Sequence, residues 1–168
     1  MNNKLTSEYV RRLFDYFPES GLLQWKVTKG KGRPGKAVGR IRRDRYGGKY
    51  FVVTIDGKIY LAHRLIFLWM VGRWPKELID HIDRNGLNNR WGNLREASKA
   101  QNGANAKLSK ANKTGYKGVY FAKKHKKWSA SIHVNHKSRN LGLFKSAIEA
   151  SKAYQRAAVE AFGEFANG

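Results

Sequence analysis

The sequence lacks cysteine altogether and has no long apolar run. The first absence excludes disulfide bonds and zinc fingers built on cysteine ligands. The longest apolar stretch, LIFLWMVG at 65–72, is too short to cross a bilayer, and MNNKLTSEYVRRLF at the N-terminus has no apolar signal core. We therefore expect an intracellular, cytoplasmic protein with no membrane partner.

Acidic residues are scarce. The chain has 12 Asp and Glu against 34 Lys and Arg, a formal net charge of +22 over 168 residues. No acidic residue lies between Glu96 and Glu149, and only Asp44 interrupts the basic run from Lys26 to Lys49. One basic run is often only a solvated surface, but two in one small chain favour contact with a polyanion, most simply nucleic acid.

The pattern of apolar residues predicts an α+β fold. A helix is expected over 7–17, a short strand over 21–27 and a loop over 29–48. A hairpin is expected over 49–65, with its turn at Asp56-Gly57, and a short helix follows before Gly72 and Pro75. Residues 91–105 are read as a loop leading into a helix.

The C-terminal third predicts a second small domain. After a polar stretch at 103–115, residues 114–144 contain three strand candidates, and in the middle one apolar and polar residues alternate from Trp128 to Asn135. A helix over 146–163, capped by Ser146 and Glu149, would cover the apolar face of this three-stranded sheet.

Chemistry concentrates in DHIDRNGLNNRWGNLR, residues 80–95. Cleavage of a phosphodiester needs a base that activates water and a group that stabilises charge on the phosphate. Histidine is the side chain suited to act as a base near neutral pH, and Asp and Asn offer the hard oxygen ligands that Mg²⁺ takes. The stretch supplies all of these groups.

This stretch, with AHRL before it and KAQNGAN after it, resembles the phage-type HNH homing endonucleases over residues 7–106. The resemblance implies a ββα-metal module with one divalent metal, Mg²⁺, with Mn²⁺ as a possible substitute. It implies that His81 is the general base, that Asn93 holds the segment so that His81 points at the phosphate, and that Asp80 and Asn102 are metal ligands. Asn102 stands where many relatives carry a final histidine.

Several residues near the motif have simpler interpretations. Asp83, Asn85, Asn88 and Asn89 are expected to shape the loop, and the tryptophans at 25, 69, 74 and 91 to be core. His63, next to Arg64, could either pack or contact a phosphate. Adjacent strand residues point to opposite faces, so the backbone must bend or leave the sheet near Asp80 and His81.

The segments YKGVY, KWSASI, LGLF and AYQRAAVEAFG resemble the APETALA2/ERF DNA-binding domain over residues 114–168. The resemblance implies DNA contacts from one sheet face, and a loop of lysines is a natural phosphate clamp. The residues that we expect to contact DNA are Tyr120, Lys123, Lys124, Lys126, Lys127, Ser131, His133, Ser138, Arg139 and Asn140, together with His63 and Arg64. A basic domain that binds DNA without sequence preference is the alternative.

Together these features predict an HNH nuclease domain over 1–106, a linker over 107–113 and a DNA-binding domain over 114–168. The expected partner is double-stranded DNA, with no small-molecule substrate, and the protein would be a monomer or weak dimer in a bacterial or phage-infected cell. The alternative is a non-cutting DNA-binding regulator with a relic HNH scaffold. The presence of Asp80, His81, Asn93 and Asn102 favours the enzyme.

Overall fold

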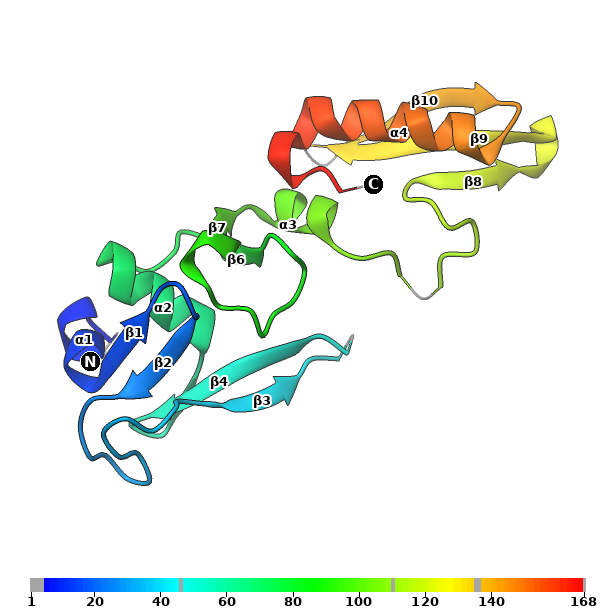
Figure 1. Cartoon of the computed structure of the whole chain (residues 1–168). Helices are drawn as coiled ribbons and strands as arrows, with labels where there is room; N and C mark the ends of the chain where they lie inside the picture. The colour runs from blue at the N-terminus through cyan, green and yellow to red at the C-terminus, as the bar shows by residue number, and fades with distance from the viewer. Residues whose placement is uncertain (1–4, 46, 110, 135–136, 168) are drawn as a thin grey trace. The chain divides into compact units, whose positions relative to one another are not determined.

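The chain forms two compact units, which together contain helices and several small antiparallel sheets (Figure 1). This confirms the predicted α+β class. The units are Met1–Glu96 and Ala97–Gly168. The computed structural model describes residues 5–45, 47–109, 111–134 and 137–167.

The first unit begins with helix α1 (Ser7–Leu13), which the side chain of Thr6 caps by accepting from the Tyr9 N–H. The predicted extension of this helix to residue 17 is wrong, because β1 (Phe14–Phe17) pairs with β2 (Leu22–Trp25). Phe14 and Tyr16 are buried and alternate with less buried neighbours, which is the two-residue period of a strand.

A three-stranded sheet follows, in the order β3 (Arg40–Arg43), β4 (Lys49–Ile55), β5 (Lys58–Leu61). The predicted hairpin is confirmed. Asp56 and Gly57 both have positive φ, 49° and 74°, as a two-residue hairpin turn requires. The all-loop prediction for 29–48 missed β3, whose four residues are exposed and lack the inward apolar side chains that mark a strand in sequence.

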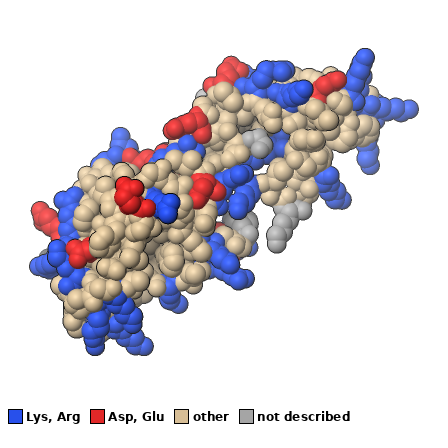
Figure 2. All heavy atoms as spheres, in the orientation of Figure 1, with Lys and Arg blue, Asp and Glu red and all other residues tan. Residues whose placement is uncertain are grey.

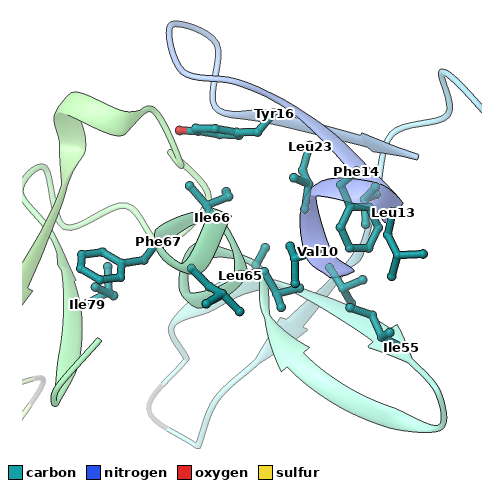
Figure 3. Packing of buried hydrophobic residues seen from close by; sticks show 14 of the residues in the cluster. Val10, Leu13, Phe14, Tyr16, Leu23, Ile55, Leu65, Ile66, Phe67 and Ile79 are labelled. Atoms are coloured by element: carbon teal, nitrogen blue, oxygen red, sulfur yellow. The ribbon is translucent and has the colours of Figure 1, made fainter. Parts of the chain in front are cut away.

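Helix α2 (Ala62–Val71) forms the centre of the first core and ends at Gly72, whose φ is 82°. Figure 3 shows side chains from α1, β1, β2, β4 and β6 converging around it. The tryptophans at 25, 69, 74 and 91 pack against this cluster, as the sequence predicts. No helix in the described part of the chain is long and apolar enough to cross a membrane.

The motif stretch builds a strand–strand–helix sequence. Strand β6 (Leu78–His81) pairs with β7 (Leu94–Ala97), and the short 3-10 turn η1 (Trp91–Asn93) precedes β7. Helix α3 (Lys99–Asn105) comes directly afterwards, started by a reciprocal capping box between Ser98 and Gln101.

The second unit contains the predicted sheet and helix. Strand β9 (Lys127–Val134) lies between β8 (Val119–Ala122) and β10 (Lys137–Phe144). The short turn η2 (Lys123–His125) joins β8 to β9. Helix α4 (Ala147–Phe162) is followed by η3 (Gly163–Phe165).

The sheet of the second unit packs on α4 through its apolar face. Ala130 and Ile132 of β9 are buried against alanines of the helix, whose small side chains allow close approach. Ser146 caps α4 by accepting from the Glu149 N–H. A capping box would also have the Glu149 side chain accept from the backbone N–H of the N-cap residue. Here it accepts from the N–H of Lys145, one residue before the N-cap.

Candidate active site

His81 is the last residue of β6 and is only 5% exposed, so its imidazole lies in the interior of the first unit. Asp80 and His81 are both inside this strand, and the loop toward β7 begins directly after His81. Its ring contacts the rings of His63 and Tyr50, with centroids 5.0 and 6.1 Å away. Its Nε2 lies 3.1 Å from the side-chain oxygen of Asn89.

Burial lowers the pKa of His81, and the hydrogen bond with Asn89 and the charges of Asp83 and Asp80 oppose that shift only in part. The imidazole is therefore neutral at neutral pH. A neutral imidazole keeps a lone pair that can accept a proton, which is what a general base requires.

Asp80, immediately before His81, is 4% exposed. Its Oδ2 accepts from Nε of Arg95 on β7 at 3.0 Å, and the Arg95 side chain of this ion pair is itself mostly shielded, 12% exposed. A buried carboxylate needs such a partner to offset the loss of hydration. The ion pair also fixes the orientation of the Asp80 carboxylate.

Asn93 braces the loop between β6 and β7. Its side-chain N–H groups donate to Asp83 Oδ1 at 2.9 Å and to the Asn88 carbonyl at 2.8 Å. Its side-chain oxygen accepts from the Asp83 N–H at 3.0 Å, and its carbonyl accepts from the Ile82 N–H. These contacts connect Asn93 to both sides of the loop, and its expected role in pointing His81 at the phosphate stays a prediction.

The loop residues largely behave as expected. Burial alone would raise the pKa of Asp83, but hydrogen bonds from Asn88, Asn85 and Asn93 lower it overall. Gly86 is required by close approach, because a β-carbon there would lie 2.5 Å from the ring of Tyr50. Asn89 departs from the prediction, since its side chain contacts His81.

His63 is 5% exposed on α2, and its Nδ1 is buried without a hydrogen-bond partner among the described residues. Burial, with smaller contributions from the neighbouring His81 and Arg64, lowers the pKa of His63 to about 3. Burial favours packing over phosphate contact for His63. Arg64 is partly exposed, and its guanidinium donates to the Glu77 carbonyl at 2.6 Å.

Asn102 lies on α3, in the second unit. Its backbone N–H donates to the Ser98 carbonyl in the first turn of that helix. Among the described residues no three His, Cys, Asp or Glu side chains group as a metal cluster. The donors proposed from the sequence, one carboxylate and one amide oxygen, have the chemistry that Mg²⁺ takes.

The expected DNA contacts on the strands of the second unit share one sheet face, with the exception of Arg139. Tyr120 is opposite Ser129, and the pairs Ser131–Asn140 and His133–Ser138 are directly opposite across β9 and β10. Directly paired residues lie on the same face, and alternate residues of β9 share it too. Tyr120, Ser131, His133, Ser138 and Asn140 therefore lie on the face away from α4.

Arg139 is the exception. It pairs in register with Ile132, whose side chain packs toward α4, and its guanidinium contacts Glu160 of that helix at 3.3 Å. The lysines at 123, 124, 126 and 127 are exposed around η2, as expected for the loop of the first hairpin, and Lys126 has a φ of 49°.

Comparison with known proteins gives a family. Residues 60–104 match the HNH endonuclease family model. A protein named as an uncharacterized HNH endonuclease of Acanthamoeba polyphaga mimivirus is 35% identical over 123 residues, which cover 71% of this chain. Protein 3.8 of Escherichia phage T7 is 34% identical over 88 residues, 52% of this chain and 72% of that protein. The chain belongs to the HNH endonuclease family.

The HNH match begins in β5 and ends in α3, so it contains Asp80, His81, Asn93 and Asn102. Tyr50 and the β1–β2 hairpin lie outside it. The alignment with the mimiviral relative spans 63% of that relative's length. No solved structure matches this HNH chain.

Sequence reasoning missed two neighbours of His81. Tyr50 lies in a strand whose apolar pattern signalled packing, and burial raises its pKa, with further contributions from Asp44 and Asp80. Asn89 was hidden among four asparagines of one loop. Asn89 is only 4% exposed, and this burial separates it from the other asparagines of the loop. Only the structure supplies that signal.

Proposed function

We propose that the protein is a metal-dependent DNA endonuclease of the homing type, which hydrolyses a phosphodiester bond in double-stranded DNA. One observation carries the proposal. A buried imidazole with a lowered pKa, His81, directly follows a buried carboxylate, Asp80, in the segment that matches the HNH family.

In this proposal the neutral His81 imidazole accepts the proton of the attacking water. The contacts of Asn93 across the loop keep β6 and the following residues in one conformation, so the base does not have to be oriented anew for each reaction. Arg95 holds the carboxylate of Asp80, the residue before His81, in place.

Asp80 and Asn102 are the residues that would hold the divalent metal, Mg²⁺ or Mn²⁺. When bound, the metal supplies positive charge that stabilises the developing charge on the scissile phosphate. The assignment of Asn102 rests on the family resemblance, and that of Asp80 also on its burial next to His81.

The charge of the surface supports duplex DNA as substrate. Lys and Arg side chains project from the visible face of each unit (Figure 2). In the first unit, the exposed β3 carries Arg40, Arg42 and Arg43, and Arg42 is paired in register with Tyr50, whose ring contacts His81. A phosphate backbone bound along this strand would therefore pass near the proposed base.

The second unit is proposed to select the site, in the manner of an APETALA2/ERF domain. Five polar residues on one sheet face, away from α4, would meet base edges in a major groove. The exposed lysines around η2 would clamp a phosphate. The proposed nuclease has one HNH site per chain. We therefore expect a monomer to nick one strand, and the same is expected of a weak dimer that does not pair its sites.

Two kinds of substitution in the second unit should have different effects on DNA binding by the full chain in EDTA. Replacing Lys126 and Lys127 with Ala should weaken binding to all sequences alike and flatten the salt dependence, for which about six phosphate contacts give a log–log slope near −5. Replacing His133 or Asn140 with Ala should reduce the preference between sequences. Titrations against a selected and a scrambled duplex measure both effects.

Lys152→Ala is the control for lost charge, because Lys152 is exposed on α4, on the other side of the sheet. Uniform weakening by all of the sheet and loop variants would show that the unit is only an electrostatic anchor.

Supercoiled plasmid tests the proposed function directly. With Mg²⁺ the protein should convert it to the nicked form, and with EDTA it should bind without cutting. Conversion in EDTA would contradict the metal requirement. Binding without cutting under both conditions would support the non-cutting regulator instead.

A further inference from the structure

The hydrogen bond of His81 determines which of its nitrogens can act. The Asn89 side-chain oxygen lies 3.1 Å from His81 Nε2. An amide oxygen only accepts hydrogen bonds, so Nε2 must carry the hydrogen. In a neutral imidazole the lone pair is then on Nδ1. The contact with Asn89 therefore fixes the tautomer as well as the ring orientation.

Asn89 is itself held from the N-terminal hairpin. The Tyr16 hydroxyl, on β1, donates to the Asn89 carbonyl at 2.8 Å in a buried contact. Figure 3 shows the hydroxyl end of Tyr16 pointing away from its own strand toward the green segment that follows β6. The next backbone link is at Trp91, whose N–H donates to the Pro18 carbonyl at 3.0 Å.

The turn of the hairpin lies directly on the same backbone. Gly21 has a φ of 74°, and a β-carbon there would lie 2.5 Å from the carbonyl carbon of Asn89 and from the N of Arg90. Any other residue at this position would push the turn and the loop apart. The hairpin and the loop are therefore fitted to each other at the level of the main chain.

The β1–β2 hairpin is anchored in the core of the first unit. Phe14 and Leu23 are buried in the core, and the Phe14 carbonyl accepts from the indole N–H of Trp69 on α2 at 3.1 Å. None of these hairpin residues lies in the 60–104 segment that matches the HNH family.

We propose that the β1–β2 hairpin is a positioning element for the reaction, which acts through Asn89 to keep Nδ1 of His81 as the basic nitrogen. Asn89, Tyr16 and Gly21 are the positioning residues. The inference rests on the proposed function for its catalytic consequence, while the tautomer of His81 can be observed without any cutting.

The first test compares Asn89→Leu, which keeps the approximate volume but removes the acceptor, with Asn89→Asp, which keeps an acceptor oxygen. Asn89→Leu should lower kcat for plasmid nicking by at least about a hundredfold, because a base in the wrong tautomer is ineffective. The KM for DNA should not change, and Asn89→Asp should retain most of the activity. Equal activity of Asn89→Leu and wild type would overturn the proposal.

The second test reads the tautomer in full-length protein with ¹⁵N-labelled histidine. Wild type should show the hydrogen of His81 on Nε2, and Asn89→Leu should show a mixture or the other tautomer. Tyr16→Phe, a milder change, should shift the signals in the same direction, with a smaller loss of kcat. Tyr60→Phe is the matched control, because Tyr60 lies in β5 and stacks on Trp74.

These outcomes separate the inference from the function on which it rests. If His81→Ala cuts like wild type, the base assignment fails, yet the NMR spectra still decide whether the hairpin sets the tautomer. If Asn89→Leu does not fold, the spectra of Tyr16→Phe decide. An unchanged His81 tautomer in the folded variants would overturn the inference.

Discussion

Replacing His81 with Ala should reduce DNA cutting by at least about a hundredfold while DNA binding stays close to that of wild type. General bases contribute about 10²–10⁴ in rate, roughly 3–5 kcal/mol of the barrier. The side chain is 5% exposed, so it offers the DNA little contact surface before the reaction. Single-turnover plasmid nicking and a binding titration in EDTA give the two quantities separately.

Because His81 lies against His63 and Tyr50, the variant also needs a check that the first unit still folds. Tryptophan fluorescence during urea unfolding reports this, since the tryptophans at 25, 69, 74 and 91 belong to its core. Loss of binding in parallel with loss of cutting, in a folded variant, would argue against the assignment of His81 as base.

Replacing Asp80 or Asn102 with Ala should move the Mg²⁺ dependence of nicking to higher concentration. Each substitution removes one oxygen donor from a metal that is expected to have few protein ligands. The Asp80 variant should show the larger effect, because it loses a charged ligand and also the partly buried ion pair with Arg95. The measurement is the nicking rate as a function of Mg²⁺ and, separately, of Mn²⁺.

Asp15→Ala is a matched control for Asp80→Ala. Asp15 is also an aspartate of the first unit, but it is paired with Lys26 at the surface, 3.5 Å away, where an ion pair contributes little. Its metal titration should match wild type. If the titrations of the Asp80 and Asn102 variants also match wild type, neither residue is a metal ligand.

Much of the fold could be predicted from the sequence, because many helices, strands and turns depend on residues that are close together in the chain. The Asp56-Gly57 turn needs positive φ at both residues, and β9 alternates apolar and polar side chains, so both are visible in sequence. The first helix was predicted too long for the opposite reason. Phe14 continues the helical spacing of Val10 and also fits the strand spacing of Phe14 and Tyr16, and pairing with β2 decided between the two.

Strand β3 was missed in the sequence because its residues are exposed. The residues of β3 carry no inward apolar pattern, and their strand geometry comes from hydrogen bonding to β4. In the second unit, pairing likewise separated Arg139 from its polar neighbours, since a shift of one residue along a strand changes the face.

The sequence by itself determined the α+β class, the basic surface, and the identity of the motif residues Asp80, His81, Asn93 and Asn102, because composition and spacing are properties of the chain alone. The tertiary structure decided what surrounds His81. Tyr50, His63 and Asn89 come from a strand, a helix and a loop, and Tyr16 reaches the loop from 73 residues away. Such contacts depend on how the elements pack around α2, and no local pattern encodes which buried amide faces the imidazole.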